Sequence, residues 1–174
     1  EREKNIRIDD SHGDIVFWPL LATAEYLTYS HDHSLLLSNA PYHPDTEATT
    51  PIWEHIQKAL EYIDTRFIPG TALISYGHGD WNDSLQPADP RMRDRLCSSW
   101  TVTLHYQTLK ALSGALQIIG STAGIPQCAE WLSVASKLDN FAERVRIDFE
   151  RFLIRDGVIA GYCYFHEDTQ KTSH

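Results

Sequence analysis

The sequence predicts an all-α fold, and three observations support this prediction. Long stretches of the chain place apolar residues at the helical spacings of three and four. Pro and Gly stand where these stretches begin and end, as they do at helix boundaries. Only one short segment, residues 158–165 (VIAGYCYF), is expected to form a strand. Consecutive helices with almost no strand indicate an architecture of helices packed on helices.

The first two predicted helices lie on either side of a polar loop. Residues 15–30 (IVFWPLLATAEYLTYS) are apolar on most sides, which predicts a helix buried against its neighbours. Pro19 falls in the first turns of this helix, where a missing N–H is tolerated. Residues 30–49 are rich in His, Asp, Asn and Pro and predict a loop. The second helix is expected to begin at Thr50-Pro51, and its apolar stripe consists of Ile52, Ile56, Ala59, Leu60, Ile63 and Phe67.

Two further helices are predicted in the second half of the chain. The third covers residues 99–119, and Gly120 and Gly124 bracket the turn that follows it. Pro126 opens the fourth, which is expected to end near Asp156-Gly157 because Gly favours helix C-caps. The tail, residues 166–174, is polar and predicts a frayed end. The fourth helix has the longest stripe: Ala129, Leu132, Ala135, Leu138, Phe141, Ala142, Val145, Phe149 and Phe152.

Composition limits the class of protein. The 174 residues fit one domain, residues 1–174, with 42% hydrophobic and 22% charged residues. A formal net charge of −9 argues against a nucleic-acid partner, which requires clustered cations. The sequence shows neither a membrane-spanning run nor a signal peptide, and its three cysteines fit a reducing compartment, so we expect a cytoplasmic protein. Glu1 stands in place of an initiator Met, which suggests that the true N-terminus lies elsewhere.

The chemistry is expected in a long loop, residues 67–98, which has no helical period but contains several glycines and aromatic residues. Its centre reads Gly77-His78-Gly79-Asp80-Trp81-Asn82-Asp83-Ser84, and we call residues 79–83 the signature. An indole offers a flat apolar face to a sugar ring, and Asp and Asn offer hydrogen-bond partners to its hydroxyl groups. A carboxyl group beside an aromatic ring and a second acid can remain protonated and act as a general acid. The alternative is a structural turn of Gly and Asx residues around a core tryptophan.

Other candidate groups have plainer interpretations. The cluster of His31-Asp32-His33 with His43 resembles a metal site only by count, since no His-x-x-x-His accompanies it, and we expect solvated loop residues and no metal. Three arginines alternate near Met92 and could meet a phosphate, although a solvated helix start is the simpler expectation. The tryptophans at predicted helix positions are expected in the core: Trp53, Trp100 and Trp131.

The signature resembles the Asp-Trp-Asn-Asp motif of glycoside hydrolase family ninety-four. That family comprises the cellobiose, cellodextrin and chitobiose phosphorylases and the phosphorylase-like part of cyclic β-1,2-glucan synthases. The resemblance covers residues 14–165, because further segments occur in the family's order. These segments are Asp14-Ile15-Val16-Phe17-Trp18-Pro19, Tyr26-Leu27, Asp32-His33-Ser34-Leu35-Leu36, Pro51-Ile52-Trp53-Glu54-His55, and Asp156-Gly157 before Tyr162 and Phe165.

This resemblance implies a partial (α/α)6 barrel of four or five helices and a role for four residues. Asp83 corresponds to the proton donor and Trp81 to the residue that lines the sugar subsite. Asp80 would orient the loop or share in sugar binding, and Asp14 matches an acid that contacts the glycosyl unit. The family has a second acid before that position, where this chain has Gly13.

The chain also departs from the family. Ser84-Leu85 and Cys97-Ser98-Ser99-Trp100 differ from the residues expected there, and a Glu is replaced in the second segment. An Arg-Asp-x-x-x-Gln-Asp motif, the His, Thr and Gly positions that hold phosphate, and the N-terminal β-sandwich are absent from the sequence. We therefore expect an internal piece of a larger enzyme, inactive alone, which forms a homo-oligomer or packs against the rest of its parent.

The function that the resemblance implies is phosphorolysis of a β-linked glucoside, with inversion, to a sugar 1-phosphate. The partners would be a disaccharide or oligosaccharide and inorganic phosphate as co-substrate, with no other cofactor. Phosphate is itself an anionic nucleophile, so one essential carboxyl group suffices where an inverting hydrolase needs two. The alternatives are an inverting glycoside hydrolase of the same fold and a non-catalytic carbohydrate-binding fragment.

Overall fold

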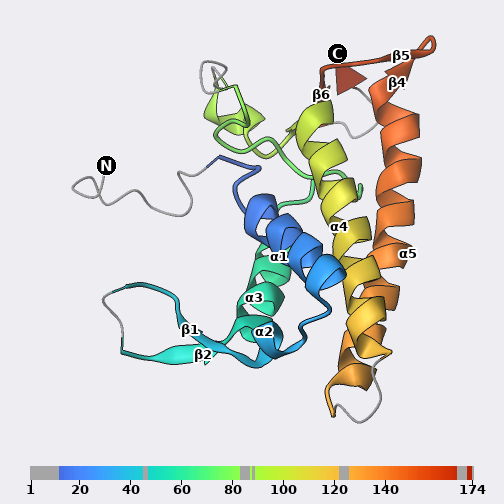
Figure 1. The fold of residues 1–174 in the computed structure, drawn as a ribbon. Helices are drawn as coiled ribbons and strands as arrows, with labels where there is room; N and C mark the ends of the chain where they lie inside the picture. The colour runs from blue at the N-terminus through green and yellow to red at the C-terminus, as the bar shows by residue number, and fades with distance from the viewer. Residues whose placement is uncertain are drawn as a thin grey trace.

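The computed structural model describes residues 12–44, 47–82, 87, 89–121, 126–167 and 172–173. These residues form a predominantly helical structure with small sheets at its ends (Figure 1). No helix among them is both long and apolar enough to cross a membrane. The helices are α1 (Phe17–Ser30), α2 (Ser34–Leu37), α3 (Ile52–Asp64), α4 (Ser99–Gly120) and α5 (Cys128–Leu153), with a short 3-10 helix, η2 (Pro90–Met92).

Helix α4 is the centre of the core. It packs against α1 on one side and against α5 on the other (Figure 1). Its buried residues therefore lie on several of its faces, whereas α3 buries one apolar face. The Trp53 indole of α3 donates a hydrogen bond of 2.8 Å to Glu130 of α5, which ties these two helices together. Large residues without exposed surface fill the centre, among them Phe17, Leu27, Leu112, Leu116 and Trp131.

Three small antiparallel sheets among the described residues complete the fold. Strands β1 (Asn39–Pro41) and β2 (Thr49–Pro51) form a hairpin before α3. Strand β3 (Leu96–Ser98) pairs with β6 (Tyr162–Phe165), which also pairs with β7 (Thr172–Ser173). Strands β4 (Ile154–Arg155) and β5 (Val158–Ile159) form a second hairpin directly after α5. The β3–β6 pairing brings the end of the long loop against a segment far along the chain.

The predicted helices are confirmed, with small shifts at their ends. The second begins at Ile52 rather than at Thr50-Pro51, because Thr50 and Pro51 belong to β2 and the Thr50 hydroxyl meets the His55 ring. The expected loop at 30–49 contains α2 and β1, and the expected strand at 158–165 is divided into β5 and β6. The tail was expected to fray, but Thr172 and Ser173 are paired with β6.

Candidate functional site

The long loop is held in place by backbone hydrogen bonds over its first half. Phe67 and Ile74 form an isolated bridge, and the Ser75 amide donates to the Arg66 carbonyl at 2.9 Å. The Tyr76 amide donates to Leu96 of β3 at 2.7 Å. Residues 67–82 contain no helix and lie at the end of the molecule where α1 and α4 begin (Figure 1). The loop is therefore built onto the helical layer at that end.

The two motifs that carry the family resemblance meet in space. His12 and Gly77 form an isolated antiparallel bridge, and the Gly13 amide donates to the Gly79 carbonyl at 2.8 Å. A Cβ atom at Gly13 would lie 2.6 Å from the Tyr76 carbonyl oxygen, closer than a real contact allows. A residue with a side chain at this position requires the backbone to move. The acid that the family has before Asp14 is thus replaced by a residue that permits close contact with the loop.

Asp80 is completely buried and accepts hydrogen bonds from two side chains. The Thr101 hydroxyl, in the first turn of α4, donates to Oδ2 at 3.2 Å. The Tyr76 hydroxyl donates a long bond of 3.5 Å to Oδ1. The Asn82 amide approaches the same oxygen at 3.4 Å. A buried carboxylate at the first turn of a long helix is also favoured by the partial positive charge of that end.

Tyr76 contributes to this buried cluster as a protonated hydroxyl. Burial, a hydrogen bond with Tyr162 and the nearby Asp80 carboxyl all raise the pKa of Tyr76 above its usual value. Its ring also meets that of Tyr162 edge to face, with 5.5 Å between centroids. The phenol therefore keeps its proton at neutral pH and remains a donor toward Asp80.

Asp14, just before α1, is a second buried acid, and Trp18 of α1 holds its carboxylate. Asp14 is 5% exposed, and the Trp18 indole N–H donates to its Oδ2 at 3.3 Å. The Phe17 amide donates to the Asp14 carbonyl at 3.0 Å, which begins the helix. Since Gly13 is bonded to Gly79, Asp14 is tied to the same end of the molecule as the signature.

Trp81 lies on the surface beside the buried Asp80. Its side chain is 64% exposed, and its ring centroid is 6.0 Å from that of Trp100, with the rings tilted by 57°. The expectation that Trp100 lies in the core is wrong, because Trp100 is 44% exposed at the second position of α4. The same expectation is confirmed for Trp53 and Trp131, which are buried. A tryptophan at a helix start can project beyond the packed stripe. Apolar periodicity alone does not distinguish such an exposed tryptophan from one in the core.

Asp83, the expected proton donor, lies outside the described residues. The structure describes the chain up to Asn82, whose amide is directed at Asp80. The signature is thus anchored immediately before Asp83 by Asp80 and, through it, by α4.

Sequence reasoning missed Thr101 and the exposure of Trp100. Both stand at the start of α4, 21 residues or fewer from the signature, and contact it only through the tertiary fold. The sequence signal for them is weak: a polar and an aromatic residue at the first turn of the helix that follows a functional loop.

The remaining candidate groups form other contacts. Asp32 accepts bonds from the Ser34 amide and hydroxyl and from the Tyr26 hydroxyl, and these bonds lower its pKa. Within the described part of the chain, no group of three or more His, Cys, Asp or Glu residues is placed to hold a metal ion. Arg91 of the basic run pairs with Asp89 at 2.6 Å, on the surface.

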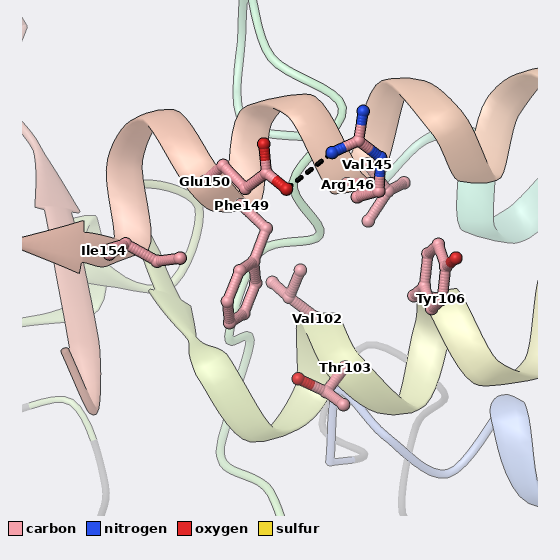
Figure 2. A pocket seen from close by; sticks show the side chains of 8 residues that line it. All are labelled: Val102, Thr103, Tyr106, Val145, Arg146, Phe149, Glu150 and Ile154. Carbon is pink, nitrogen blue, oxygen red and sulfur yellow. Dashed lines mark hydrogen bonds and ion pairs between the residues drawn. The ribbon is translucent and has the colours of Figure 1, made fainter. Parts of the chain in front are cut away.

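A separate apolar groove runs between α4 and α5, with a volume of about 300 Å³. Figure 2 shows Val102, Thr103 and Tyr106 of α4 facing Val145 and Phe149 of α5 across it. An ion pair between Arg146 and Glu150 lies along its edge. None of the described signature residues, 79–82, lines this groove, and its apolar walls suit packing better than sugar chemistry.

Comparison with known proteins identifies the family of this chain. The sequence model of the glycosyl hydrolase 94 superfamily catalytic domain matches residues 1–156, which include all five described α-helices and the long loop. A 1,2-beta-oligoglucan phosphorylase from Listeria innocua is 36% identical over 96% of this chain, and the chain spans 14% of the length of that relative. The described helices are compatible with a segment of the helical toroid that the resemblance implies. This chain therefore belongs to the glycosyl hydrolase 94 superfamily.

Proposed function

We propose that this chain carries part of the active site of an inverting glycoside phosphorylase. The observation that carries the proposal is the anchoring of the signature: Asp80 is buried on Thr101, while the next residue, Trp81, is exposed. Such an arrangement fixes a surface loop firmly while leaving its aromatic face free for a sugar. Membership of the superfamily and similarity to a phosphorylase support this class of enzyme.

In the proposed reaction, Asp83 gives its proton to the glycosidic oxygen as the bond to the anomeric carbon breaks. Inorganic phosphate attacks that carbon from the opposite face, so a β-linked glucoside yields an α-sugar 1-phosphate. Because phosphate is already an anion, the reaction needs no carboxylate to activate the nucleophile. General acid catalysis of this kind contributes about 10²- to 10⁴-fold to the rate.

The other acids of the site have different proposed roles. Asp80 is a positioning residue, since its carboxylate is buried and engaged with Thr101 and Tyr76 rather than open to a ligand. Asp14, oriented by Trp18, is proposed to bind hydroxyl groups of the glycosyl unit, and Trp81 to stack on its apolar face.

A β-1,2-linked oligoglucan is the first substrate to test, because the relative is named for 1,2-beta-oligoglucan. The groups that hold phosphate are proposed to come from parts of the enzyme outside this segment, since the chain spans 14% of that relative. A further helix of the same catalytic domain is proposed to fill the groove between α4 and α5.

The proposal is tested by Asp83→Asn in the full-length enzyme. The amide preserves shape but has no proton to give, so kcat on a natural oligoglucan should fall by about 10²- to 10⁴-fold while sugar binding changes little. A β-glucoside with a dinitrophenolate leaving group should recover much of the loss, because that group departs without protonation. Asp156→Asn, an exposed acid in the turn after α5, is the matched control and should leave the rate unchanged.

Near-normal rates of Asp83→Asn on the natural substrate would show that another group is the acid. Equal losses on both substrates would show that Asp83 acts through binding or folding and not through proton transfer.

A further inference from the structure

We propose that Trp100 is a second sugar-contacting residue of the site and helps to set its preference for oligosaccharides. This inference rests on the proposed function and adds a residue to it. Trp100 lies at the second position of α4 and is 44% exposed, next to the 64% exposed Trp81. The two indoles come from segments that are separate in sequence, and their ring centroids lie 6.0 Å apart.

One hydrogen bond joins the two backbone segments that carry the indoles. Trp81 directly follows Asp80, and Trp100 directly precedes Thr101. The Thr101 hydroxyl donates to the buried Asp80 carboxylate at 3.2 Å, so the backbones that carry both rings are joined beside them. Exposed aromatic side chains are usually free to change rotamer, whereas these two stand on an anchored pair of neighbours. The backbone positions that carry the two rings are therefore held close together before any ligand binds.

The geometry of the pair determines how a sugar can be held. With centroids 6.0 Å apart and a tilt of 57°, the rings do not enclose a pyranose as a parallel sandwich. They form an open corner, in which one ring takes the C–H face of a pyranose and the other contacts its edge or the next sugar unit. A ligand of two or more sugar units can contact both rings, so it buries more apolar area against them than a single sugar does.

The exposure of Trp100 distinguishes it from the structural tryptophans of the same helical layer. Trp53 and Trp131 are 6% and 0% exposed, and the Trp53 N–H is satisfied by Glu130. Leaving large indole surfaces in water at one place is unfavourable unless something covers them. The neighbouring signature indicates that the cover is a carbohydrate.

The test compares Trp100→Ala, Trp100→Phe and Trp81→Ala in the full-length enzyme, with β-1,2-linked glucans of increasing length. Trp100→Ala should raise KM for the longer glucans roughly tenfold, the value of one aromatic contact, and should change kcat little. Trp100→Phe should give an intermediate KM. Tyr29→Ala removes an aromatic residue that is 84% exposed at the far end of α1, and it should leave KM unchanged.

Binding measured by quenching of tryptophan fluorescence provides a readout that does not depend on turnover. Trp100→Ala and Trp81→Ala should each weaken binding, and the double variant should lose less than the sum of both losses because the rings share one ligand. Unchanged binding in a folded Trp100→Ala variant would overturn the inference. If Trp100→Ala fails to fold, a wild-type KM and affinity in Trp100→Phe overturns it instead. If Trp100→Ala loses binding while Asp83→Asn keeps full activity, the role of Trp100 in sugar binding is supported and the role of Asp83 as general acid is refuted.

Discussion

At the scale of single residues, the site depends on a buried carboxylate and the hydroxyl that meets it. Asp80 has no exposed surface, and its Oδ2 accepts from Thr101 at 3.2 Å. A buried acceptor that loses its donor costs about 1–3 kcal/mol, because Oδ2 is then neither hydrated nor bonded. Thr101 is consequently expected to matter for both stability and turnover, although it is proposed to touch no substrate.

Thr101→Val tests this expectation in the full-length enzyme. The isosteric side chain removes the hydroxyl, so the free energy of unfolding should fall by about 1–3 kcal/mol and kcat should fall as the signature loosens. Thr101→Ser keeps the hydroxyl and should restore most of the free energy of unfolding and most of kcat. The matched control is Thr108→Val in the same helix, where the hydroxyl donates to the Leu104 carbonyl at 2.8 Å. Identical denaturation midpoints and rates for Thr101→Val and Thr108→Val would contradict the positioning role.

At the scale of elements, the decisive contact is between the segment before α1 and the long loop. Gly13 donates to Gly79, and its missing side chain lets the Tyr76 carbonyl approach. Gly77, with φ of 64°, lies in the left-handed region and gives the loop its turn toward Gly13. Two segments distant in sequence thus share one backbone surface.

Gly13→Ala should disrupt that surface. The new Cβ would meet a backbone oxygen at 2.6 Å, and backbone cannot rotate away as a side chain can, so we expect a loss of stability and of activity. Gly114→Ala in the interior of α4 is the control: its Cβ would meet nothing within 4 Å. That variant should gain about 0.5–1 kcal/mol, since Ala is a better helix former than Gly. The stability of the two variants is compared by thermal unfolding, and the activity of Gly13→Ala is measured beside it. A Gly13→Ala variant with wild-type stability and activity would refute the close contact.

The elements also show how far the sequence alone could predict this structure. Helices α1, α3, α4 and α5 were predictable because each has many turns over which apolar residues repeat. Strands of two to four residues, such as β3 and β7, have too few positions to show alternation, and α2 has a single turn. The signature residues Asp80 and Trp81 were found by motif. Thr101 and Trp100 were not, because only the fold brings α4 against the loop.

At the scale of the whole molecule, α4 passes through the core and carries an unusual buried group. His105 is completely buried, and its ring contacts those of Phe17, Phe67 and Phe141 at 5.1, 5.7 and 5.9 Å between centroids. Neither ring nitrogen has a hydrogen-bond partner among the described residues. Burial therefore lowers the pKa of His105 from its usual 6.5 to about 3.

This lowered pKa predicts a pH dependence of stability. Between about pH 6.5 and pH 3 the unfolded chain binds a proton at His105 that the folded chain does not, so the free energy of unfolding falls as the pH falls. Above about pH 6.5 the effect vanishes. His105→Phe should reduce this slope by up to about 1.4 kcal/mol per pH unit and should not destabilise the chain at pH 7.5. Urea unfolding at pH 7.5, 6 and 5 measures the difference, and equal slopes in both proteins would contradict a neutral, buried imidazole.

The whole molecule also presents an apolar groove between α4 and α5 (Figure 2), with exposed apolar residues beyond it on the β4–β5 hairpin, Val158 and Ile159. Because the relative is much longer than the matched segment, packing of further helices here is the proposed arrangement.

The central claim, phosphorolysis at the signature, is tested most directly by identifying the product of the full-length enzyme. A β-1,2-linked oligoglucan is incubated with and without inorganic phosphate, and the products are followed by phosphorus and proton nuclear magnetic resonance. We predict an α-anomeric glucose 1-phosphate in an amount equal to the bonds cleaved, and no cleavage when phosphate is omitted. Release of free reducing sugar at the same rate without phosphate would contradict the account and identify water as the nucleophile.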